Sequence, residues 1–315
     1  MIKVREARYC NMKLLLIFLV IYGHLIEPQI NQNIIISIQY KFIYLFHMPT
    51  FAFLSGLFIK DYQVCTMQLK KIVLLYVSLQ LLMYVCSGGR IALLSPCWIL
   101  WYLMSLSCWL CFVLLWMKFS KGKYGIIILI LSIVVGCVVG YVGFIDRRFS
   151  LSRTLVFFPY FWLGVLLDCK TEWKKYRFAG MIALVIGIII AILNKNHLTA
   201  NFLYHAEPYG TIQNGAVLRL ACYVIGVSAI IFMLTWIPEK RFIFTKAGTN
   251  TMPAYILHAI FAVILRELYL SWYIYLVLTA LFLWMLYRVT QIEGTVYRIT
   301  LLEERGSNVH ISKNI

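Results

Sequence analysis

The chain has 315 residues, of which 62% are hydrophobic, 16% are aromatic and only 13% are charged. Soluble globular proteins carry about 25% charged residues and about 45–50% apolar ones. A single core cannot bury so much apolar surface in a chain of this size. The composition therefore excludes an ordinary soluble enzyme, a disordered protein and a collagen-like protein, and indicates a protein that crosses a membrane several times.

The net charge is +17, from 29 Lys and Arg against 12 Asp and Glu. In a soluble protein this excess would suggest a nucleic-acid partner. In a membrane protein the cytoplasmic loops collect Lys and Arg, so we expect no nucleic-acid partner here. Cys108 and Cys111 form a C-x-x-C inside an apolar run. A metal or redox site would need a polar, accessible setting, so we interpret these cysteines as small buried hydrophobic residues and expect no metal.

Ten segments satisfy the requirement of about 20 mostly apolar residues for a membrane-spanning helix. The basic start of the chain resembles a signal peptide but lacks a cleavage site, so we expect the first segment to remain as a span. The sequence predicts one all-α domain over residues 1–315, with a polar tail from about 291 and with no visible repeat or broken helix. The predicted spans are residues 12–30, 40–59, 70–87, 97–117, 124–144, 153–168, 178–194, 215–237, 252–268 and 272–290.

The basic residues predict the orientation of these spans. With the N-terminus in the cytoplasm, 21 of the 29 Lys and Arg lie on the inner side, so both termini are expected to be cytoplasmic. Arg147, Arg148 and Arg153 break this pattern, because they cluster in a short outer connection. Either a span is miscounted there, or the cluster is a binding patch for an anionic glycan or lipid headgroup.

Ionisable residues inside spans are candidates for function, because their burial is costly. Glu27 follows His24 by three residues, so the two share a helix face, and Glu27 can orient the imidazole as in acid–base catalysis. Alternatively, Glu27 lies at the outer headgroups and marks the helix end. His47 lies in the next, antiparallel span, and we place both histidines roughly 10 Å below the outer surface.

Further polar residues have a structural and a functional interpretation each. His258 lies near the middle of the ninth span, and Asn250 and Thr251 precede that span as possible caps. Arg219 lies near the outer end of the eighth span, where snorkelling to the surface is its ordinary behaviour. Lys13 lies at the cytoplasmic end of the first span, as an interface anchor or as a ligand for incoming phosphates.

At these residues the sequence resembles the membrane-bound acyltransferase 3 family, and within it the fucose 4-O-acetylase-like branch. Residues 13–24 match a basic residue, an apolar run and Gly-His. Residues 46–56 match F-H-M-P-x-F-x-F-x-S-G, the most specific signal. Weaker matches follow in order at residues 101–103, 157–164 and 248–258.

The resemblance implies an O-acyltransferase of the cell membrane that moves acetyl from cytoplasmic acetyl-CoA to a hydroxyl of a surface or secreted glycan, as in polysaccharide O-acetylation. It places the essential histidine at His24 and its basic partner at Lys13. Acetyl-CoA is then a co-substrate, and no tightly bound cofactor is expected. Cys10 and Thr251 depart from the family pattern, which commonly has Asp and Ser there.

We therefore expect His24, His47 and Glu27 to be the catalytic candidates. His24 would act as general base, which usually contributes about 10²–10⁴-fold, or as a nucleophile that carries the acyl group. His47 would polarise the thioester carbonyl. Trp101 and Tyr102 would stack on the sugar or simply pack. The alternatives are a glycan or lipid-carrier transporter with histidine relays, or a structural subunit of an export complex.

Overall fold

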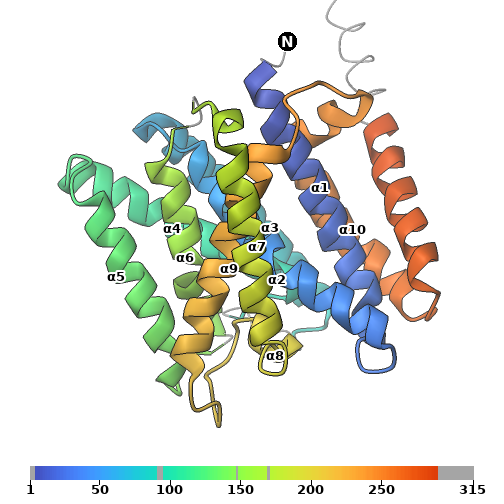
Figure 1. The fold of residues 1–315 in the computed structure, drawn as a ribbon. Coiled ribbons are helices and arrows are strands. Elements are labelled where there is room, and N and C mark those ends of the chain that lie inside the picture. Colours follow the sequence, from blue (N-terminus) through green and yellow to red (C-terminus); the bar gives the residue numbers. More distant parts are fainter. Residues whose placement is uncertain (1–3, 91–94, 147, 169–170, 290–315) are drawn as a thin grey trace, which may run out of the picture. The chain divides into compact units, whose positions relative to one another are not determined.

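The computed structural model describes residues 4–90, 95–146, 148–168 and 171–289, and all regular structure within them is helical (Figure 1). The chain divides into two compact units. The terminal unit contains residues up to Gln29 and from Glu239 onward, and the central unit runs from Ile30 to Pro238. The predicted polar tail lies outside the described residues.

The terminal unit begins with α1 (Val4–Ile26), which continues into the short 3₁₀ helix η1 (Glu27–Gln29). The chain returns to this unit with the 3₁₀ helix η6 (Ile243–Thr249) and with α10 (Met252–Arg266), both of which pack on α1. A last helix, Trp272–Val289, packs on α10 through a stacked Phe261–Phe282 pair with ring centroids 4.3 Å apart.

The axis of the chain bends by 91° between η6 and α10. Pro253 stands in the first turn of α10, where proline is tolerated because its missing N–H has no partner within the helix. The two helices form either one broken span or a re-entrant loop. The predicted ninth span, residues 252–268, covers only the α10 half of this bent pair.

The central unit contains eight α-helices among its described residues, with short 3₁₀ turns at several helix starts. Asn33 accepts hydrogen bonds from the backbone N–H of Ile35 and Ile36 and so caps the first of these helices. The helices are α2 (Ile34–Leu57), α3 (Tyr62–Cys86), α4 (Trp101–Phe119), α5 (Gly125–Val138), α6 (Leu151–Leu166), α7 (Arg177–Leu193), α8 (Ala200–Leu203) and α9 (Gly215–Trp236).

Helices α2 and α6 cross at two glycines that fit against each other's backbone. A Cβ on Gly56 would lie 2.0 Å from the carbonyl oxygen of Phe161, and a Cβ on Gly164 would lie 2.1 Å from the carbonyl oxygen of Phe53. Membrane helices approach closely where small residues meet. These glycines end the second and fourth sequence matches, which are therefore packing motifs as well.

Helices α6 and α9 are joined by two reciprocal tyrosine contacts. The Tyr160 hydroxyl donates to the carbonyl of Cys222 on α9, and the Tyr223 hydroxyl donates to the carbonyl of Val156 on α6, both at 2.9 Å. A buried hydroxyl is costly unless it is hydrogen-bonded. This pair therefore fixes the sliding position of α9 on α6.

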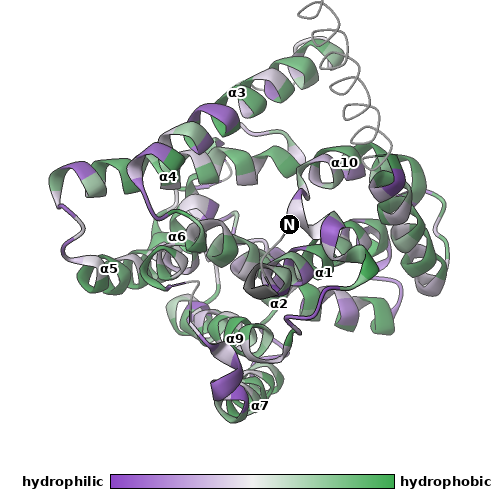
Figure 2. Cartoon of the chain, turned by 90° about the horizontal axis from the view of Figure 1, so that it is seen from above, coloured by the Kyte–Doolittle hydropathy of each residue, from purple (hydrophilic) through white to green (hydrophobic). Residues whose placement is uncertain are grey.

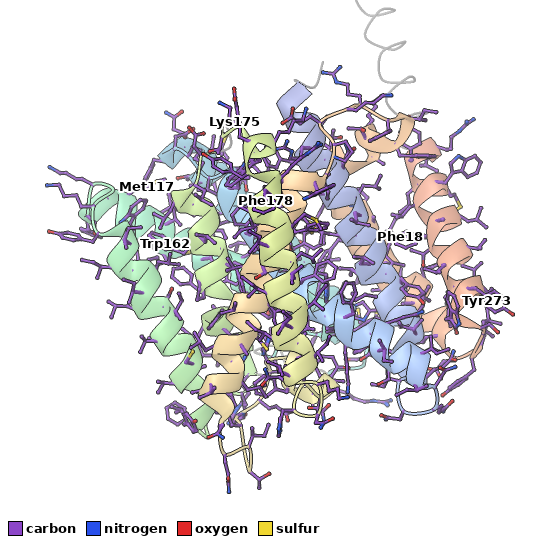
Figure 3. The ribbon with its side chains drawn as sticks, in the orientation of Figure 1. Phe18, Met117, Trp162, Lys175, Phe178 and Tyr273 are labelled. Carbon is purple, nitrogen blue, oxygen red and sulfur yellow. The ribbon has the colours of Figure 1, made fainter. Side chains whose placement is uncertain are left out.

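Among the described residues, seven helical segments are long and apolar enough to cross a membrane, or eight if η6 and α10 form one span. Apolar residues cover most of each helix in Figure 2, and on α7 and the last helix Phe178 and Tyr273, labelled in Figure 3, are 80% and 57% exposed. Such surfaces suit lipid contact. The chain is a multi-pass membrane protein. The seven segments are Ala7–Gln29, Tyr62–Cys86, Trp98–Phe119, Arg148–Leu166, Trp173–Leu193, Gly215–Trp236 and Trp272–Val289.

The other three predicted spans correspond to helices of a different kind. The fifth is a short apolar helix, Gly125–Tyr141, and the ninth is the α10 half of the bent pair. The second is α2, whose Gln39, Lys41 and His47 lower its hydropathy. The count of ten spans and the cytoplasmic position of both termini therefore stay predictions.

Candidate active site

His24 and Glu27 form the centre of the candidate site in the terminal unit. His24 lies in the last turn of α1, and its Nδ1 is 3.3 Å from Oε2 of Glu27 in η1. Both side chains are partly buried. Because a carboxylate only accepts hydrogen bonds, the imidazole in this contact carries a hydrogen on Nδ1. Nε2 of a neutral His24 then holds the lone pair that a general base requires.

His258 of α10 lies beside His24, a proximity that spacing along the sequence did not indicate. Their rings are stacked, with centroids 5.4 Å apart and planes inclined by 23°. The Nδ1 atom of His258 donates to the carbonyl of Ala254 at 3.2 Å. The side chain is fully buried, and its Nε2 has no hydrogen-bond partner among the described residues. A buried ring nitrogen of this kind is a candidate contact for a bound ligand.

His47 belongs to the central unit, and its ring is held like that of His258, through a hydrogen bond from Nδ1 to the carbonyl four residues earlier. Its Nδ1 donates to the carbonyl of Ile43 at 2.7 Å, and its ring meets the Tyr44 ring edge-on at 4.7 Å. A neutral His47 therefore has its lone pair on Nε2 and donates through that atom only when protonated. The expected polarisation of a carbonyl by His47 thus requires its imidazolium form. The matched depth of His24 and His47 stays a prediction, because each lies in a different unit.

Lys13 is half-buried on the same face of α1 as His24. Eleven residues separate them, so they differ by about 20° around the helix and by roughly 16 Å along it. Nearby, Nη2 of Arg8 lies 2.6 Å from Oε1 of Glu239. The site of the family's aspartate is Cys10, whose backbone contacts Gly248.

The segment that contains η6 is fixed to the first half of α1 by a chain of polar contacts. Thr245 donates to Oδ1 of Asn11 at 2.7 Å and accepts from the Phe242 N–H at 2.8 Å. The Asn11 amide donates to the Lys240 carbonyl at 3.1 Å. These contacts hold the residues before the bend against the N-terminal half of α1, which contains Lys13.

Replacing Gly248 with alanine is expected to weaken this attachment, since the new Cβ would lie 1.9 Å from the Cys10 carbonyl oxygen. We expect a loss of about 1–3 kcal/mol in stability, as for overpacked sites, measured as a lower midpoint of thermal unfolding in detergent. Gly143→Ala is the control, because nothing lies within 4 Å of that Cβ. Equal midpoints for the two variants would contradict the contact.

Around His47, the central unit contains a cluster of aromatic rings. Tyr40 and Tyr44 stack with centroids 4.0 Å apart, and the hydroxyls of Tyr40 and Tyr204 are 2.8 Å apart. Arg153 donates through Nε to the carbonyl of Tyr204 at 3.0 Å, and its guanidinium lies 4.8 Å from the ring centroid of Trp101. One part of the predicted arginine patch is thus next to the aromatic residues.

The three predicted outer arginines have different surroundings. Arg148 is 70% exposed and pairs with Asp146, which lowers the pKa of that carboxyl. Arg153 is half-buried, and Arg147 lies outside the described residues. The two residues predicted to contact the acceptor, Trp101 and Tyr102, also have different surroundings. Trp101 is covered by Arg153, whereas Tyr102 is buried with its hydroxyl 2.8 Å from Oγ of Ser55, which favours packing for Tyr102.

Other sequence interpretations need correction. Thr251 is the N-cap residue of α10, but its side chain makes no capping hydrogen bond among the described residues, while Asn250 ends η6 and is exposed. Cys108 and Cys111 are exposed on α4 and not buried. Exposure of small apolar side chains is expected on a helix that faces lipid, which the apolar count alone cannot distinguish from a buried one.

The chain belongs to the acyltransferase 3 family, because the family's acyltransferase domain matches residues 10–288. It is therefore a membrane acyltransferase. Neither the curated proteins nor the solved structures give a match, so the branch within the family stays a prediction.

Proposed function

We propose that the protein transfers an acetyl or other short acyl group from cytoplasmic acyl-CoA to a hydroxyl of a surface or secreted glycan, in the fucose 4-O-acetylase-like branch of the family and at the cell membrane. The observation that carries the proposal is the His24–Glu27 pair at the end of a membrane helix. A carboxylate that orients a histidine is the arrangement that acyl transfer to oxygen uses.

In the proposed reaction, Nε2 of His24 removes the proton from the acceptor hydroxyl while that oxygen attacks the thioester carbonyl. The carbon–sulfur bond then breaks, and the thiolate of CoA takes the proton back from the imidazolium. Glu27 keeps the hydrogen on Nδ1 and stabilises the imidazolium. His258, stacked on His24, is a candidate contact for the reacting groups. In the variant with an acyl group on His24, Nε2 itself attacks the thioester carbonyl and CoA leaves as the thiolate. The acceptor hydroxyl then attacks the acyl-imidazolium, the nitrogen–carbon bond breaks, and the hydroxyl proton passes to the thiolate.

Transfer of labelled acetyl tests the function directly. Membranes that contain the protein and host glycans are incubated with acetyl-CoA labelled on the acetyl carbon. We expect label in the glycan fraction for the wild type, and a decrease of at least about 10²-fold for His24→Ala at equal expression. His197→Ala is the matched control, because that histidine is exposed in the loop after α7.

The same assay separates the enzyme from a transporter. The bent pair of η6 and α10 is an observation that favours the transporter alternative, because transporters often build sites from broken helices. A transporter would move glycan across the membrane without forming a covalent acetyl ester. Movement of glycan by wild-type membranes that is lost in His24→Ala membranes, with no label transfer by the wild type, would reject the acyltransferase proposal.

Substituting Lys13 is expected to weaken donor binding. We propose that Lys13 contacts the phosphates of CoA, since it shares the His24 face and lies in the N-terminal half of α1. Lys13→Ala should then raise KM for acetyl-CoA by about tenfold, the effect of one charge-assisted contact, with a small change in kcat. The measurement is initial rate against donor concentration, with the exposed Lys71→Ala as control. An unchanged KM would assign Lys13 to membrane anchoring.

A further inference from the structure

Arg219 in the first turns of α9 is a buried cation that sequence reasoning did not recognise as such. It was expected to snorkel to the surface, but it is 1% exposed. Its guanidinium lies 5.0 Å from the ring centroid of Phe202 and 5.3 Å from that of Tyr209. It forms no ion pair with any described residue, and its Nε has no hydrogen-bond partner among them. Buried charges are ordinarily paired.

The neighbour of Arg219 is His205, which also presents a donor. Nη1 of Arg219 is hydrogen-bonded to Nδ1 of His205. Because guanidinium only donates, Nδ1 accepts, and the hydrogen of the neutral imidazole is on Nε2. Burial lowers the pKa of His205 well below its usual value, and the charges of Arg219 and Arg153 lower it further. His205 therefore stays neutral and adds an N–H without adding a carboxylate.

Arg153 supplies a second cation to the same cluster. Its Nε is bonded to the carbonyl of Tyr204, the residue before His205, and the Ser152 hydroxyl donates to the His205 carbonyl at 2.8 Å. Arg153 is half-buried, whereas Arg219 is buried. Asp146, in the loop before α6, pairs with Arg148. The cluster thus brings two cations and a neutral donor to one end of α6 and α9.

We propose that Arg219, His205 and Arg153 bind an anionic group, a carboxylate or a phosphate, carried by the glycan acceptor. Arginine suits such groups because its planar donors match their oxygens. The aromatic rings beside Arg219 hold its guanidinium in place before the anion arrives. The identity of the ligand as an acceptor rests on the proposed function, whereas binding of the anion itself does not.

Anion binding is tested without catalysis on the purified full-length protein in an uncharged detergent. The midpoint of thermal unfolding is followed by tryptophan fluorescence at constant ionic strength, against glucuronate, glucose 6-phosphate and glycerol 3-phosphate, with glucose as the uncharged control. A ligand that binds only the folded state raises the midpoint in a saturable manner. We expect this for at least one sugar anion and not for glucose.

The variants connect the effect to the cluster. Arg219→Gln should weaken the apparent affinity at least about tenfold, and Arg148→Gln should leave it unchanged because that arginine is exposed and paired with Asp146. If Arg219→Gln does not fold, Arg153→Gln provides the same test at a half-buried position. Equal affinities in wild type and the variant that folds would overturn the proposal.

The anion that binds shows whether the ligand is a carboxylated glycan, a phosphorylated glycan or a lipid headgroup. A response to glucuronate supports a carboxylated glycan, and a response to glucose 6-phosphate supports a phosphorylated one. A response to glycerol 3-phosphate alone would indicate a lipid headgroup and overturn the acceptor assignment, as would no response to any anion. Saturable binding in a protein that transfers no acetyl label would reject the proposed function while leaving the anion site intact.

Discussion

Gly56→Ala and Gly164→Ala are each expected to reduce the amount of folded protein strongly, with a loss of about 3 kcal/mol or more in stability. At both positions a Cβ would lie about 2 Å from a backbone carbonyl oxygen of the facing helix, and a backbone cannot rotate away as a flexible side chain can. Relief therefore requires α2 and α6 to separate. The measurements are the monodisperse fraction in detergent and the midpoint of thermal unfolding.

The control and the double variant sharpen this test. Gly143→Ala, which adds a Cβ in open space, should leave both measurements unchanged. The two clashes lie in one crossing, so Gly56→Ala/Gly164→Ala should cost less than the sum of the single variants, because one separation of the helices relieves both. Wild-type midpoints for the single variants would show that the two helices do not cross at these glycines.

Much of the fold could be predicted because a membrane-spanning helix requires a run of about 20 mostly apolar residues, which is visible in the sequence. Runs of apolar residues located the helices, and the helix cap at Asn33 is of a kind that sequence rules describe. The 91° bend before α10 could not be predicted from hydropathy, which is insensitive to direction. Pro49 lies inside α2 and does not end the helix, and the apolar residues on both sides of it predict one continuous segment.

In the candidate site, contacts between residues close in the sequence could be predicted, and contacts between distant residues could not. The His24–Glu27 contact follows from helical spacing, so the sequence was sufficient for it. The stacking of His258 on His24 joins residues far apart in the chain, and spacing carries no signal for it. Arg219 was misjudged because its position near a helix end suggested a surface, while Phe202 and Tyr209 come from a separate loop region that folds over it.

Glu27→Gln is expected to lower kcat for acetyl transfer by about 10²-fold or more while KM for acetyl-CoA changes little. The carboxylate accepts from Nδ1 of His24 and so keeps the lone pair on Nε2. An amide can instead donate to Nδ1, which puts the hydrogen on Nε2 and removes the base. The loss is bounded by the 10²–10⁴-fold that a general base contributes, and the measurement is the steady-state rate with labelled acetyl-CoA.

A positioning role for Glu27 makes further demands that a purely structural role does not. Glu27→Asp keeps an acceptor and should recover part of the lost kcat, whereas Glu27→Gln should not. The split between kcat and KM is the second readout, because a residue that orients the base should change kcat and leave KM for acetyl-CoA nearly unchanged. Unfolding midpoints should stay near the wild-type value, because a partly exposed contact between two polar side chains contributes little to stability. Full activity in Glu27→Gln would return Glu27 to the role of a helix-end residue at the membrane surface and leave His24 without an orienting partner.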